Sequence, residues 1–230
     1  MWSADVIKVG LAGSIRDYVM TTHWDATLRL EQIDYNGQPA GYVVDPQEVV
    51  NYVENHDNWT LFDNNAFKLP TATSREDRAR VQILGAAINS FSQGVSYFHA
   101  GIDTLRSKSL DRNSYDSGDW FNRIDWSYRD NGYAAGLPPQ GDNGGNWSVM
   151  GPLLANAGIK PTETETRWTR DAFRDLMKIR ASSRLFRLRT ADEIKQRLTF
   201  RNTGSAQVAP VLAAHLDGNG YQGAGFREVL

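Results

Sequence analysis

Two short runs of β-branched and aromatic residues, separated by one amphipathic helix, constrain the fold of this chain more than any other feature. The runs are residues 49–53 and 95–98. Between them, Ser74 followed by Asp77 has capping-box spacing and indicates the start of a helix, and Gly94 indicates its end. Because both runs are apolar on both faces, we expect two parallel strands, buried in an α/β sheet and joined by a right-handed crossover.

Two helices have clear apolar periodicity. In the first, Val81, Leu84, Ile88 and Phe91 recur at steps of three and four residues, so we expect them to form its buried stripe. The second is predicted over residues 169–181, again with apolar side chains on one side.

The remaining segments give weaker signals. Residues 6–9 favour a short strand and residues 14–20 a short helix, and 198–200 favour the first strand of a β-rich segment. Asn36-Gly37 has the residue types of a tight turn. Residues 131–161 hold 7 Gly and 4 Pro, which favours a long irregular excursion of the kind that often carries function.

Composition excludes several classes of protein. The chain has 230 residues, room for one or two domains, and no cysteine, which excludes disulfides and thiolate metal sites. Its 27 acidic and 25 basic residues give a net charge of −2, so we expect no nucleic-acid partner. A basic segment at 167–201 is better explained by a solvated helix face. No apolar run approaches the ~20 residues of a membrane span.

A polar turn directly follows the first predicted strand. Its sequence is Glu54-Asn55-His56-Asp57-Asn58. In α/β proteins, ligands bind at the carboxyl ends of parallel strands, so this turn is a candidate site. Taken alone, it could equally be an Asx turn with a hydrogen-bonded histidine. A metal site is disfavoured, because zinc needs three or four converging ligands and no other histidine is close in sequence.

A longer set of segments around this turn matches one known family. The segments are 33–37, 40–42, 45–46, 48–52, 54–58, 60–63, 94–101 and 105–123. Together they resemble the pullulanase- and limit-dextrinase-type debranching enzymes of the α-amylase family of glycoside hydrolases, and the loop 105–123 is the most specific of them. The sequence departs from the family pattern at Trp59, where glutamine is expected, at Asn113, where an acidic residue is expected, and at Asp103, where glutamate is more frequent.

The resemblance implies a fold and a function. Residues 1–183 would form the C-terminal part of a catalytic (β/α)8 TIM barrel, and residues 184–230 would begin a β-sandwich domain. The enzyme would cleave α-1,6 branch linkages in pullulan, starch, glycogen or limit dextrins by a retaining mechanism. Its partner would be a branched α-glucan.

The resemblance also assigns roles to individual residues. Asp57 would be the carboxylate that stabilises the transition state, and His56 would donate a hydrogen bond to the same sugar. The expected substrate-binding residues are Asn58, Tyr115, Asp116, Asp119, Trp120, Asn122 and Arg123. Two alternatives stay open: a salt bridge within the loop for Asp119 and Arg123, and core packing for Trp120.

Two groups that a retaining glycosidase needs are missing from the expected place. Retention requires a nucleophilic carboxylate and a separate general acid, which this family supplies from strands before the His-Asp turn. Residues 1–55 contain no Arg-x-Asp nucleophile pattern, and Arg123-Ile124-Asp125 comes too late in the chain. We therefore expect a C-terminal fragment that is inactive alone. No cofactor is identifiable, although calcium in the full-length enzyme stays open.

Three other functions remain to be tested. Isoamylases and branching enzymes belong to the same family, but the loop 105–123 disfavours them. A non-catalytic carbohydrate-binding module would fit the missing carboxylates. A metal-dependent hydrolase using His56 and Asp57 is the least favoured. The sequence does not indicate an oligomeric state, and an extracellular or cell-surface location is favoured only for the full-length enzyme.

Overall fold

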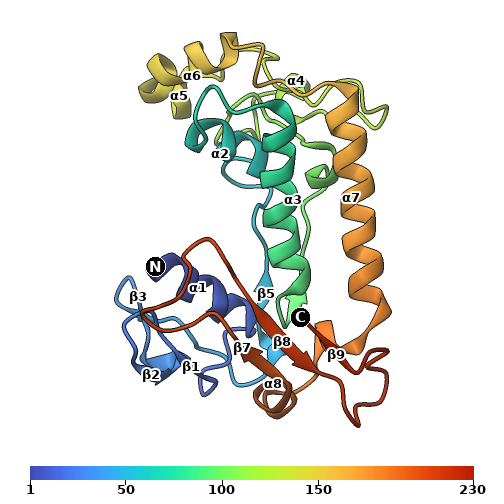
Figure 1. Cartoon of the computed structure of the whole chain (residues 1–230). Helices are drawn as coiled ribbons and strands as arrows, with labels where there is room; N and C mark the ends of the chain where they lie inside the picture. Colours follow the sequence, from blue (N-terminus) through green and yellow to red (C-terminus); the bar gives the residue numbers. More distant parts are fainter. The chain divides into compact units, whose positions relative to one another are not determined.

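The computed structural model describes all 230 residues, which divide into two compact units (Figure 1). Unit 1 comprises Met1–Asn51, Ile88–Tyr97 and Met177–Leu230, and unit 2 comprises Tyr52–Ala87 and Phe98–Leu176. Each unit has its own hydrophobic core. None of the helices combines the length and the apolar composition that a membrane span requires.

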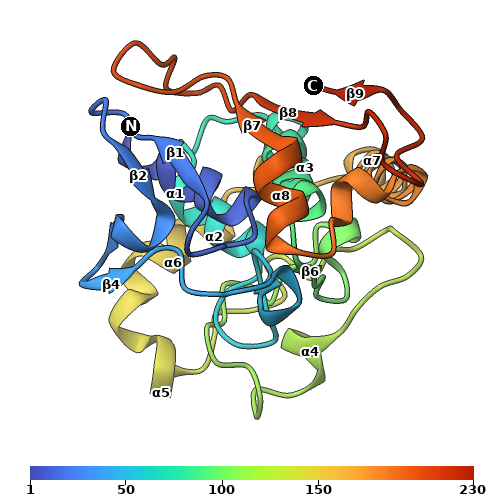
Figure 2. The same cartoon turned by 90° about the horizontal axis from the view of Figure 1, so that it is seen from below.

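Unit 1 contains all of the strands (Figure 2). Its elements are α1 (Trp2–Leu11), β1 (Val19–Thr21), β2 (Thr27–Arg29), β3 (Asp34–Tyr35), β4 (Gln38–Pro39), β5 (Val50–Asn51), β6 (Val95–Ser96), α8 (Ala191–Arg197), β7 (Leu198–Phe200), β8 (Ala214–Asp217) and β9 (Glu228–Val229). Strands β7, β8 and β9 form an antiparallel sheet, and β1–β2 and β3–β4 are antiparallel pairs. The expected turn at Asn36-Gly37 joins β3 and β4, with both residues at positive φ.

The predicted strand–helix–strand unit is confirmed. Strands β5 and β6 pair in parallel, with Val50 opposite Val95, and α3 (Arg75–Phe91) lies between them in sequence. Ser74 starts α3, since its Oγ accepts the N–H of Asp77 at 3.0 Å. Gly94 follows the helix at a φ of +98°, where a Cβ would lie 2.7 Å from Val49. That position requires glycine.

The prediction that both strands are buried is wrong for this chain. Val50 is 54% exposed and Val95 is 46% exposed, and Tyr52 is also exposed. The cause is that the parallel sheet has only these two strands, so each has an unpaired edge and uncovered side chains.

The buried face of α3 also differs from the predicted stripe. Ala79, Gln82, Ala86 and Asn89 are buried, whereas Leu84 is exposed. The two amides are buried because they bond main-chain carbonyls: Gln82 Nε2 donates to Ile102 at 3.2 Å and Asn89 Nδ2 donates to Tyr97 at 2.7 Å. Apolar periodicity could not detect a face built from alanines and hydrogen-bonded amides.

Both predictions for the first 20 residues are wrong. Residues 6–9 lie in helix α1, and residues 14–20 lead into strand β1. The buried face of α1 includes two charged residues, Asp5 and Lys8. Lys8 Nζ donates to the Asn202 carbonyl at 2.7 Å and to Gln207 Oε1 at 2.5 Å. The helical period was hidden because half of the buried side chains are polar.

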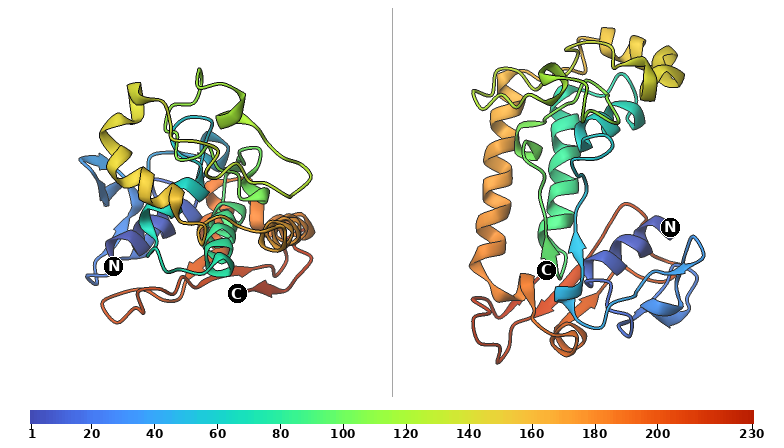
Figure 3. Two further views of the ribbon diagram at one scale, coloured as in Figure 1. Left: turned by 90° about the horizontal axis from the view of Figure 1, so that it is seen from above. Right: turned by 180° about the vertical axis from the view of Figure 1, so that it is seen from behind.

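Unit 2 is mainly helical and irregular (Figure 3). Its elements are α2 (Leu61–Lys68), the first part of α3, the 3-10 turn Ile102–Thr104, α4 (Asp119–Asn122), α5 (Gln140–Asn143), α6 (Trp147–Ala155) and the first part of α7 (Glu163–Ser182). Its core gathers Phe62, Leu105, Leu110, Tyr133 and Met150. Helices α2, α3 and α6 each contribute buried residues to this core.

Helix α7 begins six residues earlier than predicted. Glu165 Oε2 accepts the N–H and hydroxyl of Thr162 at 2.7 and 2.6 Å, which fixes the start. The strand predicted at 198–200 is confirmed as β7. The TIM-barrel portion, the β-sandwich and the boundary at residue 183 stay predictions.

Candidate functional site

The turn after β5 presents its two predicted catalytic side chains to solvent. The His56 side chain is 73% exposed and the Asp57 side chain is 68% exposed, and His56 Nδ1 lies 3.4 Å from Asp57 Oδ1. Asn55 Oδ1 accepts the N–H of His56 at 2.7 Å, and Asn58 adopts a left-handed φ of 60°. Both side chains are therefore accessible to a ligand, and the main chain of the turn is locally constrained.

Buried side chains fix the turn on both sides. On the N-terminal side, Glu54 is buried and accepts the main-chain N–H of Leu61. On the C-terminal side, the Trp59 indole donates to the Leu110 carbonyl at 2.9 Å. Thr60 caps α2, since its Oγ accepts the N–H of Asp63 at 3.1 Å. These contacts connect the turn to α2 and to the loop that contains Leu110.

Two buried charged residues lie next to the turn: Asp63 in helix α2 and Lys108 in the loop. Asp63 is fully buried and accepts hydrogen bonds from the Ser107 hydroxyl and from the Lys108 N–H, the latter at 2.8 Å. Lys108 Nζ donates to the main-chain carbonyl of His56 at 3.1 Å. Burial raises the pKa of Asp63 to about 6 and lowers the pKa of Lys108. Neither residue was among the predicted site residues.

A second buried charge in the loop connects to helix α4. Arg106 donates to the Ala100 carbonyl at 3.3 Å and to the Asn122 carbonyl at 2.8 Å. Its Nη1 lies 3.2 Å from His99 Nε2, and His99 Nδ1 lies 3.6 Å from the buried Glu54 carboxylate. Desolvation lowers the pKa of Arg106. A chain of polar contacts thus runs from the segment before the His-Asp turn to the main chain of α4.

The predicted sugar-binding loop is highly exposed. Trp120 is 71% exposed, so it is not packed in a core, and Tyr115 is more exposed still. The Arg123 guanidinium lies 5.9 Å from the Trp120 ring centroid and 2.5 Å from Asp130 Oδ2. Arg123 therefore pairs with a carboxylate just beyond the loop 105–123, and its contact with sugar stays a prediction.

Asn122 holds the loop together in this structure. Its Nδ2 donates to the Ser114 carbonyl at 2.6 Å and to the Gly118 carbonyl at 3.0 Å, and its Oδ1 accepts from the Ser114 hydroxyl at 2.9 Å. Its amide is thus engaged within the chain, and a direct bond from Asn122 to sugar stays a prediction.

The structure brings some predicted residues together and leaves others apart. Arg112 Nε donates to Asn58 Oδ1 at 3.2 Å, so the loop after Lys108 lies against the turn. No hydrogen bond or ion pair connects Asp57 with the loop residues Asp116, Asp119 or Arg123; its ion-pair partner is His56. No group of three or more His, Cys, Asp or Glu side chains is placed to hold a metal ion.

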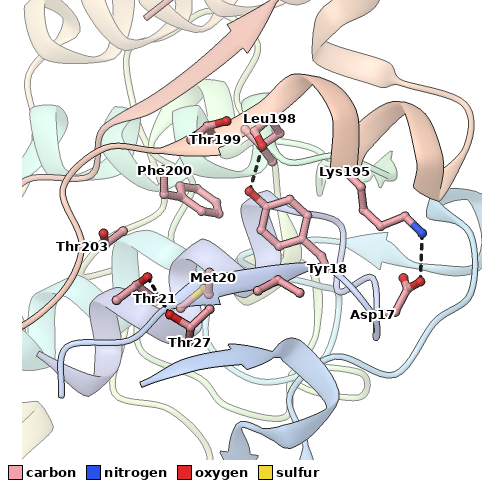
Figure 4. Close-up of a pocket in the computed structure, with 11 residues that line it drawn as sticks. Asp17, Tyr18, Met20, Thr21, Thr27, Lys195, Leu198, Thr199, Phe200 and Thr203 are labelled. Atoms are coloured by element: carbon pink, nitrogen blue, oxygen red, sulfur yellow. Dashed lines mark hydrogen bonds and ion pairs between the residues drawn. The ribbon is translucent and has the colours of Figure 1, made fainter. Parts of the chain in front are cut away.

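A separate pocket of about 440 Å³ lies in unit 1 and contains none of the predicted site residues (Figure 4). Its polar groups pair with one another: Tyr18 donates its hydroxyl to the Leu198 carbonyl at 2.9 Å, and Lys195 Nζ lies 2.8 Å from Asp17. Because these groups are already paired, the pocket does not replace the turn at His56-Asp57 as the candidate site.

Comparison with known proteins gives the class. Residues 128–229 match the family described as alpha-1,6-glucosidases, pullulanase-type, C-terminal. Pullulanase 1, chloroplastic, from Arabidopsis thaliana is 41% identical over 218 residues, which are 94% of this chain and 22% of that protein. A pullulanase from Klebsiella aerogenes is 40% identical over 214 residues, 93% of this chain and 19% of that protein. The chain thus spans about a fifth of the length of these curated relatives.

Solved structures agree. Apo pullulanase from Klebsiella pneumoniae superposes with a TM-score of 0.93 at 39% identity, covering 97% of this chain and 24% of that one. The Klebsiella pneumoniae pullulanase complexed with maltotriose gives a TM-score of 0.92 at 39% identity, covering 97% of this chain and 21% of that one. All of these similar proteins are named pullulanases. The chain belongs to the pullulanase-type α-1,6-glucosidase family.

Proposed function

We propose that this chain supplies part of the substrate site of an enzyme that hydrolyses α-1,6 branch linkages in pullulan, starch, glycogen or limit dextrins with retention. The observation that carries the proposal is the His56-Asp57 turn. Its two side chains are exposed at the end of a parallel strand pair, while buried charges hold the turn from beneath. This is the end of such strands where ligands bind.

Each residue has a role that its chemistry supports. Asp57 accepts hydrogen bonds from sugar hydroxyls and stabilises the positive charge of an oxocarbenium-like transition state. His56 donates to the same sugar. The outer sugars contact the residues Asn58, Tyr115, Asp116, Asp119, Trp120, Asn122 and Arg123. The exposure of Tyr115 and Trp120 suits stacking on the apolar faces of sugar rings.

The chemistry also needs a nucleophile and a general acid about 5–5.5 Å apart. The family supplies them from strands before the His-Asp turn, and residues 1–55 lack the nucleophile pattern. We therefore propose that residues 1–230 bind glucan but do not cleave it. The open edges of β5 and β6 support the proposal that the pair belongs to a larger parallel barrel.

A non-catalytic glucan-binding role is the second candidate, and the missing nucleophile favours it. An isoamylase or a branching enzyme has less support, because the similar proteins named above are pullulanases. The hydrolase and the glucan-binding role share the same sugar contacts. They differ in whether the glycosidic bond is cleaved once a nucleophile and a general acid are supplied.

The test is calorimetric binding of maltotriose and pullulan to the chain, together with an assay for released reducing ends. The wild type should bind both sugars and release no reducing ends, and Asp57→Ala should weaken binding by at least about tenfold, as expected when a charge-assisted hydrogen bond is lost. Asp192→Ala is the matched control, because Asp192 is an exposed carboxylate of unit 1. Equal binding by wild type and Asp57→Ala would refute the proposed role of Asp57.

A further inference from the structure

Lys108 is buried without the ion-pair contact that a buried lysine ordinarily has. It is 1% exposed, and its Nζ has one short contact, the 3.1 Å hydrogen bond to the carbonyl of His56. Burying a charge is expensive unless hydrogen bonds and opposite charges compensate. A methionine of similar length would fill the same space at lower cost, so the ammonium calls for a functional explanation.

The position of Lys108 is fixed from the main-chain side. Its N–H donates to Asp63 Oδ2 at 2.8 Å, and Asp63 is itself fixed in helix α2, next to the Thr60 cap. The Ser107 hydroxyl bonds the same carboxylate and accepts the N–H of Ser109 at 2.9 Å. The loop is therefore pinned to α2 on both sides of the ammonium.

The ammonium contacts the main chain of the His56-Asp57 turn and lies among charged side chains. It donates to the carbonyl of the peptide that joins His56 to Asp57, so it limits rotation of that peptide. It also lies in the field of three carboxylates, those of Asp63, Asp111 and Asp57, opposed by Arg106. The contacts of Glu54 and Trp59 fix the two ends of the turn, and the Lys108 hydrogen bond is made to the His56–Asp57 peptide between them.

We propose that Lys108 is a positioning residue of the glucan site, whose buried ammonium holds the His56–Asp57 peptide in the orientation that presents both side chains to sugar. This inference rests on the proposed function, because it assumes that His56 and Asp57 contact sugar. Lys108 itself touches no substrate and acts through the main chain of the turn.

The sequence offers a direct probe of this peptide. The four histidines precede Trp24, Asp57, Ala100 and Leu216, so His56-Asp57 is the only His-Asp pair in the chain. Labelling with carbonyl-13C histidine and 15N aspartate therefore gives a single NMR cross-peak that reports this peptide alone. Loss of the hydrogen bond from Lys108 should move its carbonyl shift upfield.

The experiment compares the wild type with Lys108→Met and with Arg78→Met. Arg78 is a matched control, since it is a buried cation of the same unit that donates to the carbonyls of Pro70, Thr71 and Thr73. Lys108→Met should move the cross-peak and weaken maltotriose binding about tenfold. Arg78→Met should change neither, whatever its effect on stability. If Lys108→Met does not fold, Lys108→Arg keeps the charge and should retain a cross-peak close to that of the wild type, with partial binding.

Each other result counts against the proposal. The proposal fails if Lys108→Met leaves the cross-peak unmoved, or if it moves the cross-peak but keeps wild-type affinity. It also fails if the wild-type cross-peak has a random-coil shift, or if the Lys108→Arg cross-peak is displaced as far as that of a random coil. If the wild type shows the displaced cross-peak but binds no maltotriose, the proposed function fails while the contact made by Lys108 stands. The two failures are therefore distinguishable.

Discussion

Asp63 Oδ2 accepts the main-chain N–H of Lys108 at 2.8 Å, which joins a fully buried carboxylate to the loop beneath the His56-Asp57 turn. Burial raises the pKa of this carboxyl from its ordinary value of 3.8 to about 6. The hydrogen bonds from Ser107 and Lys108 oppose that rise but do not cancel it. Asp63 should therefore contribute to the pH dependence of the stability of unit 2.

The first prediction follows from this pKa. Because the folded pKa lies above the unfolded one, Asp63 contributes stability that is present below about pH 3.8 and is lost as the pH rises through about 6. The loss should approach roughly 3 kcal/mol. Asp63→Asn cannot titrate, so the difference in unfolding free energy between variant and wild type should grow in favour of the variant between pH 4 and pH 7. Urea unfolding followed by tryptophan fluorescence measures it, and a constant difference would contradict the assignment.

The second prediction concerns Trp120. It is 71% exposed, so Trp120→Ala should change the unfolding free energy by no more than about 0.5 kcal/mol. Maltotriose binding should nevertheless weaken, by roughly threefold to tenfold, because about 1 kcal/mol of aromatic contact is lost. Trp126→Ala is the control, since Trp126 is also exposed but was not predicted to contact sugar. Equal effects of the two substitutions on affinity would remove Trp120 from the site.

The third prediction concerns Arg180 in unit 1. Its guanidinium donates to the carbonyls of Ser90, Phe186 and Gly94 at 2.5, 2.8 and 3.2 Å, and to that of Ser92 at 3.3 Å. Arg180→Met should lower the unfolding free energy by roughly 3 kcal/mol or more, because several main-chain carbonyls lose their donor. Arg189→Met removes an exposed arginine and should have little effect. Thermal unfolding of both variants provides the comparison, and similar midpoints would show that the carbonyls find water instead.

The fourth prediction concerns the core of unit 2. Tyr133 is fully buried and donates its hydroxyl to the Leu153 carbonyl at 2.7 Å. Tyr133→Phe should cost about 1–3 kcal/mol, because the carbonyl is left without its partner while the volume is nearly unchanged. Phe121→Tyr, at a half-buried position of α4, measures the effect of a single hydroxyl at a less buried site. An unfolding free energy equal to that of the wild type would mean that the bond contributes nothing net.

The parts of the fold that were predictable are those where residue type directly determines geometry. Ser74 and Gly94 set the limits of α3 through a cap and a positive φ, and residues 198–200 are strand β7. The apolar rules failed where polar side chains are buried, as with Lys8 in α1 and Gln82 and Asn89 in α3. Their burial depends on hydrogen-bond partners far away in sequence, such as Asn202 for Lys8.

The candidate site shows the same division. His56 and Asp57 could be identified because an exposed polar turn directly follows a strand and belongs to a specific motif. Lys108, Asp63 and Arg106 were missed, although Lys108 and Arg106 lie within the most specific segment. The sequence did offer one signal, because all three are charged residues inside segments that resemble the family. A charged residue in a loop is ordinarily expected to be exposed to solvent, so this signal did not indicate that they are buried. Burial, which gives them their roles, is visible only in the structure.

The most direct test of the central claim is a titration of the chain, labelled as above, with maltotriose and with the β-linked cellotriose. The single His56–Asp57 cross-peak should shift saturably with maltotriose and stay in place with cellotriose. No shift with either sugar, or equal shifts with both, would contradict the claim that this turn is part of an α-glucan site.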